Sequence, residues 1–222
     1  MIVPMTAAAR SAEQPVPAGV ETVAFRASRD PQAELSRTRA TPAGAFRAAR
    51  RTFLSGERLD MRSLAGELHI SRATLYRWCG DREQLLSDVL WSLSHQIFER
   101  AKQDHAPRAG AERVLAVFRQ HVGTLVRAQP LQAFLQQETH AALRLLTSEQ
   151  GSVQRRTVGD LAGLLREEEE AGALRPRADV DSLAYAIVRM TEGFIYHDTV
   201  VGAEPDVERA ASIVSLLLGQ PG

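Results

Sequence analysis

The stretch that decides the fold is DMRSLAGELHISRATLYRW, residues 60–78. Apolar residues at helical spacing lie on both sides of His69–Ile70, and Asp60 and Ser71 each stand where a helix would begin. Asp and Ser side chains accept hydrogen bonds from the free N–H groups of a first helical turn. The turn between the helices favours left-handed backbone, and His is among the non-glycine residues that adopt it. The sequence therefore predicts two short helices joined by a tight turn.

Helical spacing of apolar residues continues outward from this stretch through most of the chain. One helix is expected before it, from Pro42 to Gly56, and a long helix is expected after it, beginning at Asp81. No alternating run bounded by hairpin turns predicts a strand. We therefore expect an all-α protein of about nine helices. The remaining five helices are predicted over residues 114–130, 131–146, 153–171, 183–194 and 207–218.

Three segments are expected along the chain. Residues 1–35 are rich in Ala, Pro, Ser and charged side chains, which predicts a disordered leader. Residues 36–82 contain three helices that form a helix-turn-helix unit, and residues 83–222 form a larger helical bundle. A single cysteine, Cys79, excludes an intramolecular disulfide and fits a reducing compartment. No apolar run approaches the ~20 residues that span a bilayer, so a cytoplasmic protein without a membrane partner is expected.

The net charge of zero conceals an uneven distribution. Residues 1–82 carry 13 Lys and Arg against 8 Asp and Glu, whereas residues 83–222 carry 14 against 19. A basic half favours contact with a polyanion such as DNA, although a solvated Arg-rich surface explains the same counts. The major groove admits one helix, and the second helix of the pair presents arginines, a hydroxyl and aromatic rings outward. These features together favour a helix-turn-helix that binds double-stranded DNA.

The stretch SLAGELHISRATLYRWCGDREQLL, residues 63–86, resembles the signature of the TetR family of repressors. In that signature a turn and S-x-x-T-L-Y lead to a short loop and K/R-E-x-L. His69 and Cys79 depart from the pattern, which mostly has Gly and Phe there. The resemblance covers residues 41–90 and implies a homodimeric, ligand-responsive transcriptional regulator. Such a regulator is most commonly a repressor that leaves a palindromic operator when a small-molecule effector binds.

A second resemblance concerns the effector. The runs FLQQETHAALRLLT (134–147) and YAIVRMTEGFIYHD (185–198) make the chain similar to the QsdR-type subgroup of the family. This resemblance implies a lactone or another small acyl compound as the effector.

The family resemblance also implies the roles of individual residues in DNA binding. An arginine can pair with guanine through two hydrogen bonds, whereas hydroxyl, indole and guanidinium groups donate to phosphate. Arg77 is expected on the same outward surface. Base contacts are implied for Arg62, Arg72 and Ala73, and phosphate contacts for Thr74, Tyr76, Trp78 and Arg82.

Two stripes of polar and aromatic residues are candidates for ligand binding. The first recurs at i, i+4, i+7 and i+11, which places its members on one helical face. An ion pair between Arg189 and Glu192, or hydrogen bonds across a dimer interface, would explain the first stripe equally well. Phe118, His121 and Phe134 are more typical of a plain core. The stripes are Tyr185, Arg189, Glu192 and Tyr196 in one helix, and Trp91, His95 and Phe98 in another.

The last two predicted helices resemble the pair that forms a four-helix dimer interface in this family. A homodimer is expected because helix-turn-helix proteins usually match two half-sites with two-fold symmetry. No metal-ligand spacing, phosphate loop or catalytic set occurs, so no metal, cofactor or enzymatic activity is expected. The alternative is an all-α ligand-binding or enzymatic bundle with a vestigial headpiece. The expected interface residues are Ile187, Thr191, Ala211 and Val214.

Overall fold

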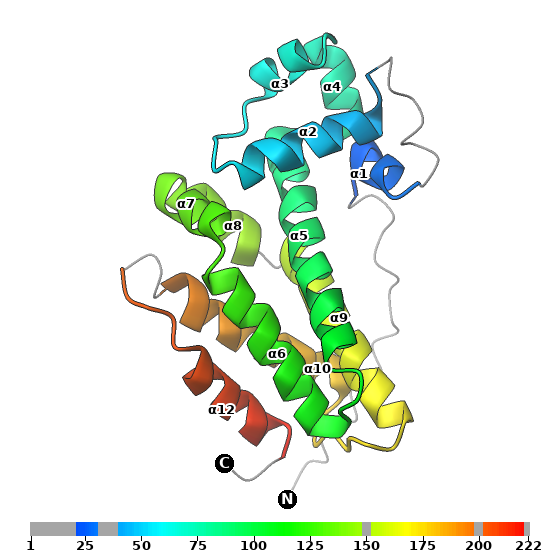
Figure 1. Cartoon of the computed structure of the whole chain (residues 1–222), viewed down its shortest axis with the longest axis vertical. Coiled ribbons are helices and arrows are strands. Elements are labelled where there is room, and N and C mark those ends of the chain that lie inside the picture. Colours follow the sequence, from blue (N-terminus) through cyan, green and yellow to red (C-terminus); the bar gives the residue numbers. More distant parts are fainter. Residues whose placement is uncertain (1–20, 31–39, 148–151, 198–201, 220–222) are drawn as a thin grey trace, which may run out of the picture.

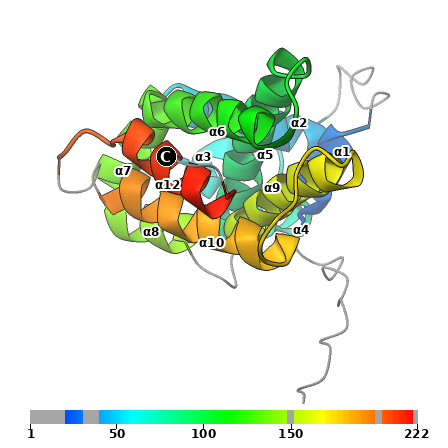
Figure 2. The same ribbon diagram turned by 90° about the horizontal axis from the view of Figure 1, so that it is seen from below.

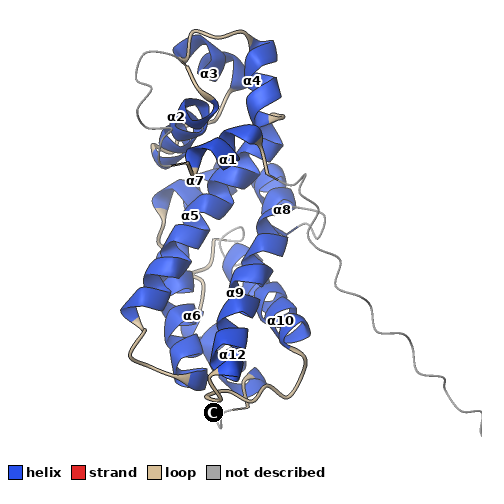
Figure 3. Ribbon diagram, turned by 90° about the vertical axis from the view of Figure 1, so that its right-hand side faces the viewer, coloured by secondary structure: helices blue, strands red, loops and turns tan. Residues whose placement is uncertain are grey.

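The computed structural model describes residues 21–30, 40–147, 152–197 and 202–219. These residues form eleven α-helices and one π-helical turn, and no strand occurs among them (Figure 3). The prediction of an all-α protein is confirmed. Two helices exceed the expected nine, because the helix predicted over 131–146 is divided and because a further helix precedes the headpiece. The divided helix consists of α7 (Gln129–Gln137) and α8 (Thr139–Thr147).

The headpiece contains the predicted helix-turn-helix at one end of the molecule (Figure 1). Its helices are α2 (Pro42–Leu54), α3 (Met61–Glu67) and α4 (Arg72–Cys79). Both predicted caps are confirmed: Asp60 accepts a hydrogen bond from the backbone N–H of Ser63, and Ser71 accepts one from that of Thr74. His69 has a φ of +52°, the left-handed conformation expected for the turn.

Part of the predicted disordered leader is a helix, α1 (Val23–Ser28). Thr22 caps this helix by accepting a hydrogen bond from the N–H of Phe25. The Phe25 ring is buried, with its centroid 5.1 Å from that of Phe46 and 5.5 Å from that of Trp91. Six residues are too few to give a detectable helical period, so tertiary packing decides this element. Residues 1–20 and 31–35 of the predicted leader lie outside the described residues.

The bundle is built around α5 (Arg82–Asp104), which runs from the headpiece towards the opposite end of the molecule (Figure 1). It packs between α6 and α9, α9 packs on α10, and α12 closes the arrangement by contacting both α10 and α6 (Figure 2). Among the helices described, none has the length and apolar character needed to span a lipid bilayer. The bounds are α6 (Gly110–Val126), α9 (Ser152–Glu170), α10 (Val180–Glu192), the π-helix η2 (Gly193–His197) and α12 (Val207–Leu217).

The headpiece core continues past residue 82 into the bundle. One cluster of buried residues joins α1–α4 to the first half of α5 and to α7 and α8. Within it the ring centroids of Phe53 and Phe134 lie 5.8 Å apart. A second cluster joins the remainder of α5 to α6, α9, α10 and α12. Continuous packing therefore connects the headpiece to α7 and α8.

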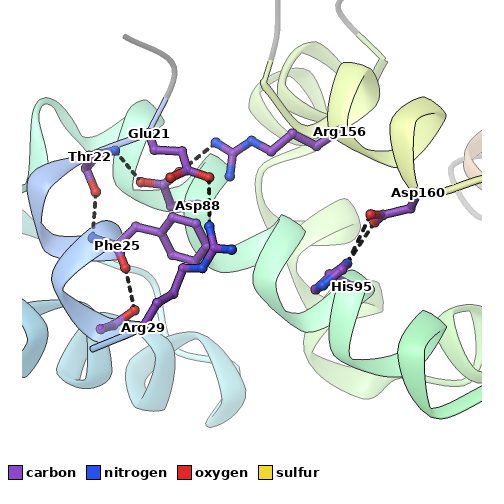
Figure 4. A network of polar contacts seen from close by, with 9 residues as sticks. Glu21, Thr22, Phe25, Arg29, Asp88, His95, Arg156 and Asp160 are labelled. Carbon is purple, nitrogen blue, oxygen red and sulfur yellow. Dashed lines mark hydrogen bonds and ion pairs between the residues drawn. The ribbon is translucent and has the colours of Figure 1, made fainter. Parts of the chain in front are cut away.

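A buried ion pair holds α1, α5 and α9 together (Figure 4). Asp88 of α5 is fully buried and accepts a hydrogen bond of 2.7 Å from the guanidinium of Arg156 on α9. The backbone N–H of Thr22 donates to the other carboxylate oxygen at 2.9 Å. The Arg156 guanidinium also lies 4.9 Å from the ring centroid of Trp91 and 5.5 Å from that of Phe25. Three segments distant in sequence therefore meet at one carboxylate.

Replacing Asp88 with Asn is expected to lower the free energy of unfolding by about 3 kcal/mol, because it removes the buried carboxylate that pairs with the Arg156 guanidinium. Urea denaturation followed by circular dichroism would measure this loss. The control is Asp181→Asn, which breaks the exposed pair between Arg166 and Asp181 and is expected to cost less than about 1 kcal/mol. Equal losses in the two variants would contradict the central role of the buried pair.

Candidate DNA-binding face and ligand cavity

The outward side of α4 carries the side chains predicted to contact DNA. Leu75 and Cys79 point into the headpiece core and are fully buried. Tyr76 is 48% exposed. Ser71 and Thr74 lie at the start of the helix with their hydroxyl oxygens 3.0 Å apart. The structure places Arg62, Arg72, Ala73, Tyr76 and Arg77 as exposed, and Thr74 and Trp78 as half-buried.

Arg82 differs from this expectation because its guanidinium is engaged within the protein. Its Nε donates a 2.6 Å hydrogen bond to the carbonyl of Leu59, and a terminal nitrogen lies 2.6 Å from the carboxylate of Glu138. Arg58 approaches the same carboxylate at 3.6 Å. Arg82 therefore ties the start of α5 to the segment before α3 and to the end of α7. The implied phosphate contact from Arg82 is replaced by this internal link.

An apolar cavity of about 180 Å³ lies within the bundle. Side chains from α5, α6, α9 and α10 form most of its wall, with contributions from α2, α7, α8 and η2. The cavity therefore touches both the middle of α5 and, through Phe53 and Leu54 of α2, the headpiece. The apolar lining includes Leu90, Leu93, Ile97, Phe98, Phe118, Val122, Leu125, Leu131, Leu161, Ile187 and Val188.

Polar groups gather at two places in the lining. At one, the hydroxyl of Ser94 lies 3.0 Å from Nε2 of the buried His121. At the other, the Glu192 carboxylate accepts hydrogen bonds from the Gln154 amide at 3.2 Å and from the Arg189 guanidinium at 2.8 Å. Burial raises the pKa of the Glu192 carboxyl, although Gln154 and Arg189 act in the opposite direction.

Asp160 is a third polar group in the lining, and it connects the cavity to the aromatic residues of α5. Its two carboxylate oxygens each lie 3.1 Å from Nδ1 of His95 (Figure 4). The His95 ring stacks on Trp91 with centroids 4.6 Å apart. Burial raises the pKa of Asp160, while the adjacent His95 lowers it. His95 and Trp91 therefore stand behind the wall and hold a residue that lines it.

The structure divides the predicted ligand residues into two groups. Phe98, Glu192 and Tyr196 line the cavity. Four others lie outside the lining: Trp91 and His95 support it from behind, Tyr185 is 41% exposed, and Arg189 contacts Glu192 and the Thr147 carbonyl.

Several lining residues were missed from the sequence. Phe118 and His121, interpreted as plain core, both line the cavity. On α9, Gln154, Thr157 and Leu161 recur at i, i+3 and i+7, and all three line it. That helical spacing could have identified these three residues from the sequence, since the same kind of spacing identified the stripe in the penultimate helix.

The predicted dimer-interface residues lie inside the protomer, which corrects the prediction. Ile187 and Thr191 line the cavity, and Ala211 and Val214 are fully buried in the second core cluster. The residues are small or apolar because they pack within one chain. The exposed apolar side chains of these two helices are Tyr185 on α10 and Leu216 and Leu217 on α12, which are 41%, 59% and 37% exposed.

Residues 109–219 match the family described as the Tetracyclin repressor-like, C-terminal domain. The chain belongs to the TetR family. It is similar to the R. erythropolis transcriptional repressor QsdR, with 29% identity over 80% of this chain and 94% of that chain, and a TM-score of 0.74. No curated protein sequence matches the chain. The protein is therefore a DNA-binding transcriptional regulator of the TetR family.

Two more distant structures share the fold. The TetR family repressor AlkX from Dietzia sp. is 21% identical over 81% of this chain and 98% of its own, with a TM-score of 0.55. FadR from Bacillus subtilis, solved in complex with stearoyl-CoA, is 17% identical over 80% of this chain and 98% of its own, with a TM-score of 0.53.

The buried His121 gives the regulator a measurable pH dependence. Burial lowers the pKa of His121 to about 4 from an ordinary value of 6.5. Between these values the unfolded chain binds a proton that the folded chain does not, so stability falls as the pH is lowered. The full decrease is about 3 kcal/mol. We expect His121→Gln to remove this component, so that the difference in unfolding free energy between variant and wild type changes across pH 6.5 to 4.

Denaturation at several pH values measures that difference. The control is the exposed His140, whose replacement by Gln should leave the slope unchanged. A His121→Gln profile parallel to that of the wild type would show that His121 is protonated in the folded protein.

Proposed function

We propose that this TetR-family regulator is a repressor that binds a palindromic operator as a homodimer and leaves it when a small molecule enters the cavity. The observation that carries the proposal is the continuity of α5. Only two residues separate this helix from the end of the recognition helix α4, and its middle forms a wall of the cavity. One rigid element therefore connects the site that would sense the ligand to the face that would bind DNA.

The mechanism follows from the geometry of DNA. Two recognition helices of a dimer can enter successive major grooves only when they lie about 34–36 Å apart. A ligand that favours another position of α5 would change this spacing and prevent simultaneous binding to both half-sites. The ligand shifts the balance only by its difference in affinity for the two arrangements. A lactone or another small acyl compound is proposed as the effector, on the basis of the resemblance to the QsdR-type subgroup.

The DNA contacts are proposed from residue chemistry and exposure. Tyr76 supplies a phenolic donor for phosphate, and Arg77 supplies positive charge beside it. Base-edge contacts are assigned to Arg62, Arg72 and Ala73, and phosphate contacts to Thr74, Tyr76, Trp78 and Arg77. Arg82 is excluded from this set because its guanidinium binds Leu59 and Glu138.

Replacing Arg72 with Ala is expected to weaken binding to the preferred operator by ~1–3 kcal/mol and to relax preference at one base position. Fluorescence anisotropy with DNA from upstream of the regulator's own gene, in excess nonspecific competitor, would measure both effects. Arg175→Ala is the control, since Arg175 is an exposed arginine beyond the end of α9, far along the chain from α4. Equal weakening on all sequences would assign Arg72 to phosphate and contradict base readout.

The dimer surface is proposed on the exposed faces of α10 and α12. Tyr185, Leu216 and Leu217 are large apolar side chains exposed on these two helices. A two-fold dimer uses the same patch on both copies, so such a surface can bury itself against a second copy of the chain. The occupant proposed for this face is therefore a second protomer, which the two half-sites of a palindromic operator also require.

Replacing Leu216 with Glu is expected to convert the dimer to monomers at micromolar concentration, because two like charges would be buried across the interface. Sedimentation velocity would measure the mass, and anisotropy would show operator affinity falling with it. Val23→Glu is the control, since Val23 is 43% exposed and lies on α1. A Leu216→Glu protein that sediments as a dimer would place the interface elsewhere.

A further inference from the structure

The cavity lining contains carboxylates but no side chain that is cationic at neutral pH. Asp160 and Glu192 line it, whereas Lys and Arg are absent from the described residues that do so. Among the described lining residues, the side chain that carries a titratable nitrogen is His121, and burial lowers the pKa of its imidazole to about 4. A negatively charged ligand would therefore find no counter-charge and would lose its hydration, which is costly in an apolar cavity.

Both carboxylates already have cationic or imidazole partners behind the wall. His95 contacts Asp160, and Arg189 contacts Glu192, from outside the lining. Each carboxylate is therefore hydrogen-bonded to a side-chain nitrogen before a ligand enters. The cavity therefore favours an uncharged ligand over an ammonium compound as well as over a carboxylate.

The remaining polar groups are arranged mainly as hydrogen-bond acceptors. The Thr157 and Thr191 hydroxyls donate to the backbone carbonyls of Val153 and Ile187, so they offer only lone pairs. The two oxygens of the Glu192 carboxylate have about four lone-pair sites, more than its bonds to Gln154 and Arg189 use. The hydroxyl of Tyr196 has no hydrogen-bond partner within the described part of the chain, which leaves it available as a donor.

The size of the cavity limits the size of the ligand. A cavity of about 150 Å³ in another protein accommodates benzene. The volume here is about 180 Å³. Benzene has six non-hydrogen atoms, so in proportion to volume a ligand of roughly seven non-hydrogen atoms is an appropriate occupant.

We propose that the effector is an uncharged amphiphile of about seven non-hydrogen atoms, whose polar end donates a hydrogen bond to Glu192 and accepts one from Tyr196. The proposal rests on the function proposed above, since it names the ligand class of the same cavity. Among lactones and other acyl compounds, it selects those that carry an N–H or O–H group and excludes free carboxylates.

Isothermal titration calorimetry on the full chain at pH 7.5, without DNA, tests the proposal with four matched probes. Pentanamide has the required donor and acceptor, pentanoate adds negative charge, pentylamine adds positive charge, and 2-hexanone lacks a donor. We expect pentanamide to bind at least about tenfold more tightly than each of the others, since a hydrogen bond to a charged group contributes ~1.5–3 kcal/mol. Equal or tighter binding of any other probe, or no binding of pentanamide, would overturn the proposal.

Variants assign the contact to named groups. Glu192→Gln removes the negative charge and adds an amide donor, so pentanoate should gain about tenfold relative to pentanamide. Glu170→Gln, at the exposed end of α9, is the matched control and should change neither affinity. Tyr196→Phe should weaken binding of pentanamide several-fold, which keeps the test decisive if Glu192→Gln does not fold. Unchanged probe preference in both folded variants would refute the assigned contacts.

A space-filling variant locates the binding. Thr157→Phe should abolish heat of binding for every probe while circular dichroism shows the wild-type helical signal. Retained binding would refute the cavity as the site. DNA release is measured separately by anisotropy, so the two proposals fail in different ways. Pentanamide that binds as described without releasing operator DNA would refute the proposed effector response and leave the ligand class standing.

Discussion

The arrangement of the whole molecule depends on one buried carboxylate, that of Asp88. A charge removed from water is tolerated only when it is paired and hydrogen-bonded. Its partners come from α9, through Arg156, and from the start of α1, through the backbone of Thr22. Moving α9 away from α5 would separate the buried carboxylate from its Arg156 counter-ion, and moving α1 away would remove its hydrogen bond from the Thr22 backbone. The headpiece and the bundle are therefore fixed to each other by electrostatics as well as by the packing of Phe25 and Trp91.

The same helix carries the functional elements in order along its length. It begins beside the recognition helix, reaches the buried pair at Asp88, and then contributes Ser94 and Phe98 to the cavity. His95 lies between the last two and holds Asp160 of α9, which lines the cavity. On another side, Arg82 binds Glu138 at the end of α7, whose first turn also reaches the cavity. The elements that line the cavity are thus connected to the headpiece on two sides.

The headpiece could be predicted from sequence because its signals are local. Asp60, Ser71 and His69 each determine a cap or a turn within a few residues of themselves. Only part of the cavity could be predicted from sequence. Residues that share one face of a helix contact different neighbouring elements at different points along that helix. Tyr185 is exposed, whereas Glu192, two turns further, meets Gln154 of α9. The π-helical turn at 193–197 also alters the residue spacing on which the stripe was based. Small and apolar residues at the predicted interface look the same whether they pack inside a protomer or between two.

The junction between α4 and α5 explains why movement of α5 would reach the DNA-binding face. Only Gly80 and Asp81 separate the two helices. Gly80 has a φ of +65°, and a Cβ there would lie 1.9 Å from the Oε1 atom of Gln84. That atom is fixed, since it accepts the N–H of Asp81 while the Asp81 side chain accepts the N–H of Gln84. The link is therefore short, reciprocally hydrogen-bonded and closed to any side chain at Gly80, so it contains no flexible segment that could absorb a displacement of α5.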